Sequence, residues 1–376
     1  MGKVPTKTIF VLFLVVLAFL AVQDFALRGA DGVFGDYLRR VFDEEARDFR
    51  GWENMPHRAR TGAVTRAAGG IKVVRFPHPG GRVELRRGEV NQIRVGYEIV
   101  VYADRPEQAA RYLSRVDVQQ VVDGGLLTFR LQEPRVRDEG VRSVRVNYTA
   151  ALPAGLLTEV TGSEGVTARG LTGSLVVEGG GPVTVAGVTG DIKIDGCPGL
   201  EITGVKGNVW VRAFAQDGYI AGVDGNLTLD NRNGDVIVEN LRGDLEAKFD
   251  GRLLVNGVAG TVRVEGRGGL FDAAHIDGPV TVNGRELLVN LRDIRGDTRV
   301  TAAGRSNVLC ELPAGREGCR VTALSRGGRI VTNLPLTLVE TGAGEQKATG
   351  RVGNGRYRVD IATEASNIYL RSPQGK

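Results

Sequence analysis

Cysteine and histidine are both scarce in this chain of 376 residues, which contains three of each. So few cysteines cannot form the disulfide framework of a small secreted scaffold. His57, His78 and His275 are scattered and give no zinc-ligand spacing, and the sequence has neither a phosphate-binding loop nor a nucleophile elbow. We therefore expect no enzymatic activity, no cofactor and no metal site.

A large excess of one charge is missing as well. The net charge is +5, and Lys and Arg are interspersed with Asp and Glu instead of forming blocks. Nucleic-acid-binding proteins carry clustered basic residues, so we expect no nucleic-acid partner. Glycine, in contrast, is abundant: the 54 glycines are about twice the usual share of roughly 7%. This composition is typical of a fold with many tight turns.

One apolar run stands out, Ile9–Val22, and it follows Lys3 and Lys7. Such a segment is either an export signal or an N-terminal anchor. A cleavage after Ala21 would place the large Phe19 three residues before the cut, which favours an uncleaved anchor over a removed peptide. Positive charge before the run predicts a single-pass protein of the cell membrane, with a cytoplasmic amino terminus and the bulk of the chain extracytoplasmic.

Glycine recurs at a fixed period in the middle of the chain. Eight glycines follow one another at intervals of 17 or 18 residues, at positions 173, 190, 207, 225, 243, 260, 278 and 296. An aliphatic residue stands two positions before each of them, and an apolar-x-apolar triplet follows, as in Ile192-Lys193-Ile194. This alternation predicts half-buried strands, and a unit so short can bury its apolar face only against its neighbours.

These patterns predict an all-β fold, a parallel β-helix (β-solenoid) with coils of 17 to 18 residues and two or three short strands per coil. Stacked coils rise about 4.8 Å each, so eight coils make a rod on the order of 40 Å long. The strict six-residue pattern of the left-handed hexapeptide helix is missing, and right-handed crossovers are the strong default. We therefore predict right-handed coils.

The predicted organisation has five segments: an anchor or transmembrane helix (1–30), a juxtamembrane amphipathic helix and linker (31–69), a small β-rich cap (70–150), the solenoid (151–340) and C-terminal closing strands (341–376). The amphipathic helix, Val33–Trp52, either docks on the protein's own next domain or lies on lipid. A short helix, Pro106–Val116, interrupts the cap, which covers the first open edge of the solenoid. Strand signals at Arg329–Thr332, Arg356–Ile361 and Asn367–Arg371 are expected to close the far edge.

The middle residue of each apolar-x-apolar triplet points outward. Read down the coils, these residues are Val176, Lys193, Trp210, Thr228, Glu246, Arg263, Thr281 and Arg299. Trp210 is the exception in an otherwise solvated row, and Phe214 and Tyr219 are close to it in sequence. Its indole either stacks on a sugar ring or a partner, or is covered by the loop 212–218. Trp210, Phe214, Tyr219 and Lys193 are therefore the candidate ligand or partner surface.

Acidic and amide residues follow five of the periodic glycines: Asp191, Asn208, Asn226, Asp244 and Asp297. Calcium sites and carbohydrate-cleaving solenoids need clustered carboxylates, whereas these stand one at a corner. Asp and Asn also stabilise tight turns by bonding their own backbone, and we favour this explanation.

Two of the cysteines, Cys310 and Cys319, flank a short segment that contains Pro313 and Gly315. In an oxidising compartment they could close this segment as a disulfide-bonded loop. As small apolar side chains they could equally be buried and unpaired.

Several motifs together resemble a known family. Val146-Asn147-Tyr148-Thr149 leads through Leu152-Pro153-Ala154-Gly155 into repeated Gly-Asp-Ile and Gly-Asp-Val corners, and the chain ends with Ser366-Asn367-Ile368-Tyr369-Leu370. Over residues 90 to 372 this resembles the bacterial β-strand-repeat family of adhesin-like domains of unknown function. The resemblance implies the solenoid fold and a link to the cell envelope, often through a membrane anchor, and it supplies no catalytic residues.

The sequence therefore favours a non-enzymatic cell-envelope protein, displayed from the membrane for adhesion, scaffolding or envelope-stress sensing. Its expected partners are the membrane, through the anchor, and a cell-wall glycan or an envelope protein. One alternative is a cell-wall or polysaccharide-processing enzyme on a β-helix scaffold, which requires a carboxylate cluster on one lateral face. Another is a self-assembling scaffold similar to bactofilins, which requires uncovered solenoid ends.

Overall fold

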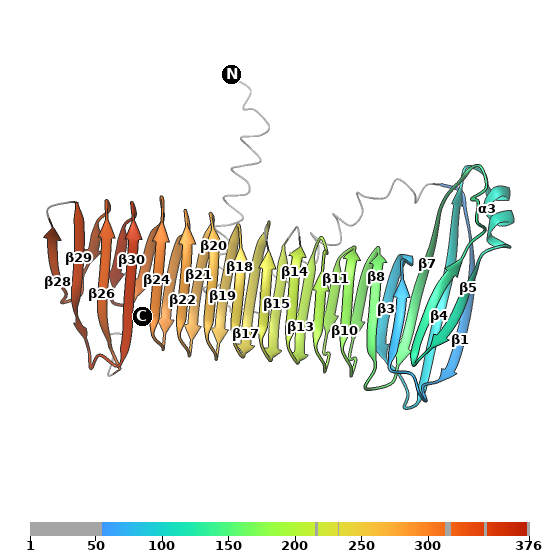
Figure 1. Ribbon diagram of the computed structural model, residues 1–376, viewed down its shortest axis with the longest axis horizontal. Coiled ribbons are helices and arrows are strands. Elements are labelled where there is room, and N and C mark those ends of the chain that lie inside the picture. Colours follow the sequence, from blue (N-terminus) through green and yellow to red (C-terminus); the bar gives the residue numbers. More distant parts are fainter. Residues whose placement is uncertain (1–54, 215–216, 232, 313–316, 342–343, 374–376) are drawn as a thin grey trace, which may run out of the picture. The chain divides into compact units, whose positions relative to one another are not determined.

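The computed structural model describes residues 55–214, 217–231, 233–312, 317–341 and 344–373. Residues from His57 onward form one compact unit, built almost entirely of strands (Figure 1). The predicted anchor and juxtamembrane helix lie outside the described residues. Among the described residues, no helix has the length and apolar character needed to cross a membrane.

The unit begins with β1 (His57–Ala67), β2 (Val73–Pro77), β3 (Gly80–Arg87), β4 (Gln92–Ala103), α3 (Pro106–Leu113), β5 (Asp117–Asp123), β6 (Leu126–Gln132), β7 (Val141–Leu152), β8 (Leu157–Ser163) and β9 (Gly165–Arg169). The middle contains β10 (Leu175–Gly180), β11 (Val183–Ala186), β12 (Ile192–Asp195), β13 (Leu200–Lys206), β14 (Val209–Phe214), β15 (Gly218–Asp224), β16 (Leu227–Asn231), β17 (Asp235–Arg242), β18 (Leu245–Phe249), β19 (Arg252–Val258), β20 (Val262–Arg267), β21 (Leu270–Ile276), β22 (Val280–Arg285), β23 (Leu288–Ile294), β24 (Thr298–Ala303) and β25 (Asn307–Glu311). The chain ends with β26 (Cys319–Arg326), β27 (Ile330–Thr332), β28 (Thr337–Thr341), β29 (Glu345–Val352), β30 (Tyr357–Glu364) and β31 (Ile368–Arg371).

Two long sheets face each other across one core. Sheet A has 15 strands in the order β1-β4-β7-β3-β9-β11-β13-β15-β17-β19-β21-β23-β25-β31-β27, and sheet B has 16 strands in the order β28-β29-β26-β30-β24-β22-β20-β18-β16-β14-β12-β10-β8-β2-β6-β5. Each repeat contributes one strand to each sheet, and neighbouring repeats pair in parallel, as in Ile192 with Val209. The structure is therefore a β-solenoid with two strands per coil, which confirms the predicted all-β repeat architecture.

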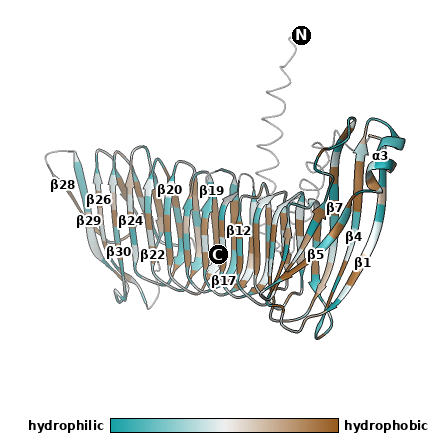
Figure 2. Ribbon diagram, turned by 45° about the vertical axis from the view of Figure 1, so that its right-hand side comes forward, coloured by the Kyte–Doolittle hydropathy of each residue, from teal (hydrophilic) through white to brown (hydrophobic). Residues whose placement is uncertain are grey.

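The predicted inward and outward positions are confirmed. The aliphatic residues two positions before the periodic glycines are all buried, none more than 5% exposed: Leu171, Val188, Val205, Val223, Leu241, Val258, Ile276 and Ile294. They belong to one continuous core that runs the length of the unit, and Figure 2 shows hydrophobic positions alternating with hydrophilic ones along the strands. The outward residues pair in register from Val176 to Arg299 as the sequence predicted.

The periodic glycines stand where the backbones of neighbouring coils approach each other closely. A Cβ atom on Gly207 would lie 2.4 Å from the carbonyl oxygen of Gly190, one coil earlier. The same holds at Gly225, where the oxygen of Gly207 would be 2.2 Å away. Since an ordinary contact of a Cβ atom is 3.4–4 Å, no other amino acid fits without moving the backbone. The period in the sequence therefore records a column of glycines whose backbones touch.

A second column, three positions before the first, shares one backbone conformation but not one residue type. Its members all have a φ between 48° and 74°: Gly170, Gly187, Gly204, Gly222, Asn240, Gly257, His275 and Asp293. Glycine and asparagine adopt this left-handed conformation most easily. The later coils place His275 and Asp293 there, and the His275 Nδ1 lies 2.8 Å from the Asp293 Oδ2.

The amino-terminal end of the unit differs from the predicted division into a separate cap and solenoid. β2 and β3 pair in parallel with β8 and β9, so they form a coil of the solenoid itself. This coil lies between β6–β7 and β8–β9, although it precedes β6 and β7 in sequence. The expected linker before residue 69 contains β1, which pairs antiparallel with β4. Its side chains are mostly exposed, so it has no apolar alternation by which the sequence could have revealed it.

The short helix expected near Pro106 is confirmed as α3. It packs against β1, β4 and β7, with Ala109, Tyr112 and Leu113 buried. The Tyr112 hydroxyl lies 3.1 Å from the Glu133 Oε2, to which it donates a hydrogen bond. In Figure 1, α3 lies at the end of the rod that carries β1 and β5. The helix therefore covers part of the core at that end.

Of the three carboxyl-terminal segments expected to close the far edge, only Arg329–Thr332 lies there, as β27 at the end of sheet A. β30 pairs in parallel with β24 on one side and with β26 on the other, and β31 likewise lies between β25 and β27. The last coil in sequence is therefore the second to last in space. The hairpin of β28 and β29 forms the outer edge of sheet B, and Leu334 and Leu336 pack against the core beside it.

Candidate ligand surface

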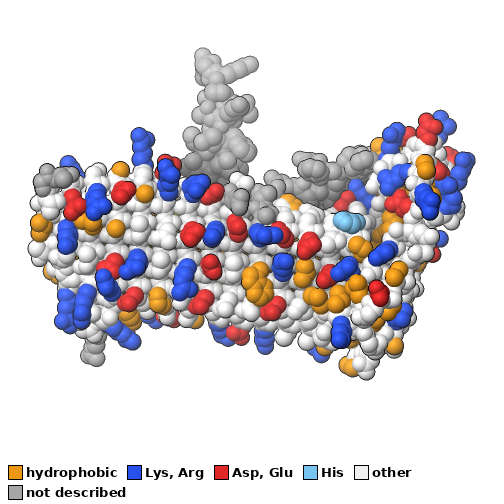
Figure 3. Space-filling model, viewed as in Figure 1, with side chains coloured by type: hydrophobic (Ala, Val, Ile, Leu, Met, Phe, Trp, Pro, Cys, Tyr) orange, Lys and Arg blue, Asp and Glu red, His pale blue; other side chains and the backbone are white. Residues whose placement is uncertain are grey.

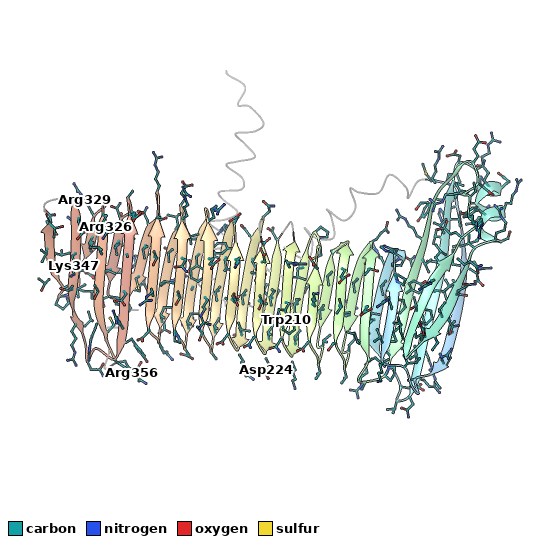
Figure 4. The ribbon with its side chains drawn as sticks, viewed as in Figure 1. Trp210, Asp224, Arg326, Arg329, Lys347 and Arg356 are labelled. Atoms are coloured by element: carbon teal, nitrogen blue, oxygen red, sulfur yellow. The ribbon has the colours of Figure 1, made fainter. Side chains whose placement is uncertain are left out.

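Trp210 lies near the middle of the outer face of sheet B (Figure 4). It belongs to β14, whose inward neighbours Val209 and Val211 are buried, and the pleat therefore turns the indole outward. The residue is 41% exposed. Lys193 and Thr228 are its register partners on the two neighbouring strands. An aromatic ring is thus presented to solvent between two polar side chains.

A charged group lies two residues further along the same strands. The register places Arg212 between Asp195 and Asp230, and the Arg212 guanidinium forms a salt bridge with the Asp195 carboxylate. The hydrogen bond from Arg212 holds the pKa of Asp195 below its ordinary value and raises the pKa of Arg212. Sequence reasoning missed these three residues, although their spacing of two from the outward row already placed them on the Trp210 face.

The other aromatic candidates do not join Trp210. Tyr219 lies on β15 in sheet A, so it projects from the opposite face of the solenoid. Its hydroxyl donates a hydrogen bond to the Glu239 Oε2 at 2.9 Å. Phe214 is the last residue of β14, and its side chain lies outside the described set. The candidate surface therefore contains Trp210 and Lys193 from the predicted group, together with the charged residues beside them.

The Asp and Asn residues at the corners form a ladder between coils. The Asp191 Oδ1 accepts a hydrogen bond from the Asn208 backbone N–H at 2.9 Å, and the Asn208 Oδ1 accepts one from the Asn226 N–H at 3.0 Å. The ladder continues through Asp244 to the Thr261 N–H. We expected these side chains to bond their own turns, but each bonds the next coil instead. They are therefore structural, which agrees with the preference for a non-catalytic role.

The three cysteines are unpaired thiols and all are buried. Cys310 lies on β25 and Cys319 on β26, and the coil of β30 and β31 stands between those two levels. Two strand spacings are about 9.6 Å, whereas the Cα atoms of a disulfide lie roughly 4.4–6.8 Å apart. Burial raises the pKa of the Cys310 thiol to about 12. Of the two possibilities left by the sequence, the structure has the buried, unpaired one.

The described residues contain no group of three or more His, Cys, Asp or Glu side chains that could hold a metal ion. A shallow, open depression lies on sheet A at the β1 end, lined by Arg86, Arg87, Gly88, Glu89, Arg94, Gly96, Thr149 and Ala151. Within it the Arg94 Nη2 lies 2.9 Å from the Glu89 Oε2. It offers no enclosed space and no paired carboxylates for general acid and base catalysis.

The chain matches no protein-family model and no curated protein. Solved structures similar to it include a “putative cell adhesion protein” from Clostridium sporogenes ATCC 15579 (11% identity, TM-score 0.20, 84% of this chain and 100% of that chain). Others are a “putative adhesin” (9% identity, TM-score 0.27, 83% and 97%) and a “putative lipid binding protein” (10% identity, TM-score 0.20, 84% and 97%), both from Parabacteroides distasonis ATCC 8503. Identities this low carry no function over to this chain.

Proposed function

We propose that this chain is a non-enzymatic envelope protein that uses the outer face of sheet B as a flat recognition surface for a glycan. The observation that carries the proposal is the exposed indole of Trp210 beside Lys193 and the Arg212–Asp195 pair. An aromatic ring stacks on the apolar face of a sugar, and adjacent charged groups bond its hydroxyls.

The rigidity of the solenoid supports this use. Trp210 is held by a strand with hydrogen-bonded parallel neighbours on both sides and buried valines on either side of it in sequence. Its backbone therefore needs no ordering when a ligand binds, which lowers the entropic cost of association. A flat face also suits an extended polymer better than a small molecule, which requires a concave site.

The proposed location rests on the sequence. The apolar run Ile9–Val22 after Lys3 and Lys7 supports an N-terminal anchor that displays the solenoid outside the cell membrane. The right-handed crossover preference supports right-handed coils. In this arrangement the solenoid holds the recognition surface away from the membrane and supports it rigidly. Its partner is a cell-wall glycan or another component of the envelope.

The deciding experiment is binding of the full chain, in detergent micelles, to a glycan array and to insoluble peptidoglycan. Trp210→Ala is compared with Tyr369→Ala, a matched control that removes an aromatic ring 37% exposed on sheet A. We expect Trp210→Ala to weaken binding by about tenfold or more, as at an aromatic hot spot, and Tyr369→Ala to leave it unchanged. Equal binding by wild type and Trp210→Ala would contradict the proposal.

A further inference from the structure

A second surface, unrelated to Trp210, lies at the far end of sheet B. Arg351 on β29, Arg320 on β26 and Arg358 on β30 occupy the same register position on three neighbouring strands. All three are exposed and lie on the outer face of the sheet, because their neighbours Val352, Val321 and Val359 point into the core. We call these three residues the arginine row. Figure 3 shows Lys and Arg gathered at this lower corner, where Figure 4 labels Arg356.

The row replaces the polar ladder found in the preceding coils. Asp297 stands at the same corner one coil earlier, and its Oδ1 accepts a hydrogen bond from the Arg358 backbone N–H at 2.8 Å. The same position carries Asp or Asn from Asp191 to Asp244, then Thr261 and Pro279 before Asp297, and the last three strands stack arginines there about 4.8 Å apart. Like charges directly opposite one another destabilise a sheet. The repulsion between these arginines therefore destabilises the fold, and a bound anion would reduce that repulsion.

Carboxylates only partly neutralise this corner. Arg358 pairs with Asp360, with 2.6 Å between Nε and Oδ2, and Arg356 pairs with Glu317. Among the described residues, Arg320 and Arg351 form no salt bridge, and residues 313–316 contain no acidic residue. The two side chains converge over Gly355, where an added Cβ would lie 2.9 Å from the Arg351 Nε and 3.1 Å from the Arg320 Cγ.

We propose that the arginine row binds the anionic groups of an extended polymer, with phosphate, sulfate or carboxylate as the recognised group. Guanidinium forks bond such groups in pairs. The row is open and flat, so it suits a chain with repeated charges better than a single small anion held in a pocket. It lies about 60 Å along the sheets from β1.

The test uses the full chain and four probes: long-chain polyphosphate, dextran sulfate, polygalacturonate and phosphatidylcholine vesicles containing phosphatidylglycerol. The triple variant Arg320→Gln, Arg351→Gln, Arg358→Gln is compared with Lys206→Gln, Arg242→Gln, Arg263→Gln, which lowers the net charge equally, from +5 to +2. The control cations alternate in register with Asp224 and Glu246, so they form no cluster. We expect wild type to bind at least one soluble polymer in a salt-sensitive manner. We expect the affinity to fall about tenfold or more in the row variant and to stay unchanged in the control variant.

Each other outcome overturns the proposal. Equal losses in both triple variants would show an effect of bulk charge, and binding to the vesicles alone would identify a membrane as the partner. If the wild-type protein binds none of the three soluble polymers, the proposal is wrong. The row variant relieves repulsion between arginines but also removes the exposed Arg358–Asp360 pair, and surface pairs contribute little to stability. It is therefore expected to melt close to wild type; if it melts lower, Arg320→Gln alone replaces it. Trp210→Ala is expected to bind the polymers normally, which separates this surface from the proposed glycan face.

Discussion

Substitution of Gly207 by alanine tests the physical basis of the repeat. The added methyl would lie 2.4 Å from the Gly190 oxygen and 2.6 Å from the Gly190 carbonyl carbon. To restore an ordinary contact, the two coils must separate by about 1 Å, roughly a fifth of their 4.8 Å spacing. Overpacking of this kind costs about 1–3 kcal/mol. The φ of Gly207 is 147°, and a residue with a Cβ pays about 1–3 kcal/mol more there.

The matched control is Gly170→Ala. Gly170 also has a positive φ, 62°, but a Cβ there would meet no atom within 4 Å. Only the conformational term remains, about 1–2 kcal/mol. Gly170→Asn is expected to cost less still, because Asn240 adopts the same conformation in a later coil of the same column.

Urea unfolding of the three variants, followed by far-ultraviolet circular dichroism, measures these differences. We expect the free energy of unfolding to fall by about 2–6 kcal/mol in Gly207→Ala, from the sum of the two terms, and by much less in the Gly170 variants. A Gly207→Ala protein as stable as Gly170→Ala would refute the close approach of neighbouring coils as the origin of the glycine period.

Three further predictions address other parts of the structure. Asn208→Ala removes the acceptor for the Asn226 N–H and should lower the unfolding free energy by about 1 kcal/mol, whereas Asn208→Asp should be neutral; urea titrations compare the two. Ser366→Ala removes the buried acceptor for the Ser306 N–H and should cost about 1–3 kcal/mol, measured in the same way. Cys310, with its pKa raised from 9.0 to about 12, should resist iodoacetamide at pH 8.5 until the protein unfolds, as mass spectrometry can show. Because the folded pKa is the higher one, its contribution to stability should be constant below pH 9 and fall as the pH rises from 9 to 12.

The periodic core was predictable because its determinants repeat. Each coil carries an inward aliphatic residue, a glycine at the close approach and an apolar-x-apolar triplet, so eight copies reinforce one pattern. The second column was not recognised because its residue type changes from Gly222 to Asn240 and later to His275, while only the backbone conformation is shared. A conformation without a constant residue leaves little trace in one sequence.

The candidate surface was predictable at Trp210 and not at Tyr219. Outward placement of Trp210 follows from the alternation of its own strand, which is local information. Tyr219 is only nine positions away, but the corner between β14 and β15 carries the chain to the other sheet. Two residues that are close in sequence therefore lie on different faces wherever the chain turns from one sheet to the other between them. The Asn208 ladder shows the same limit, since its partners lie 17 or 18 residues away instead of within one turn.

The order of the end coils was beyond local reasoning because β30 has the same alternation as any interior strand. The order of these coils decides which strands form the edges of the two sheets. At the β1 end both outer strands, β1 and β5, pair antiparallel with their neighbours, and at the far end β28 does so in sheet B. The remaining edge, β27, is only three residues long. A parallel coil from a second molecule would therefore find no full-length parallel strand to extend, and this opposes the end-to-end stacking that a bactofilin-like scaffold requires.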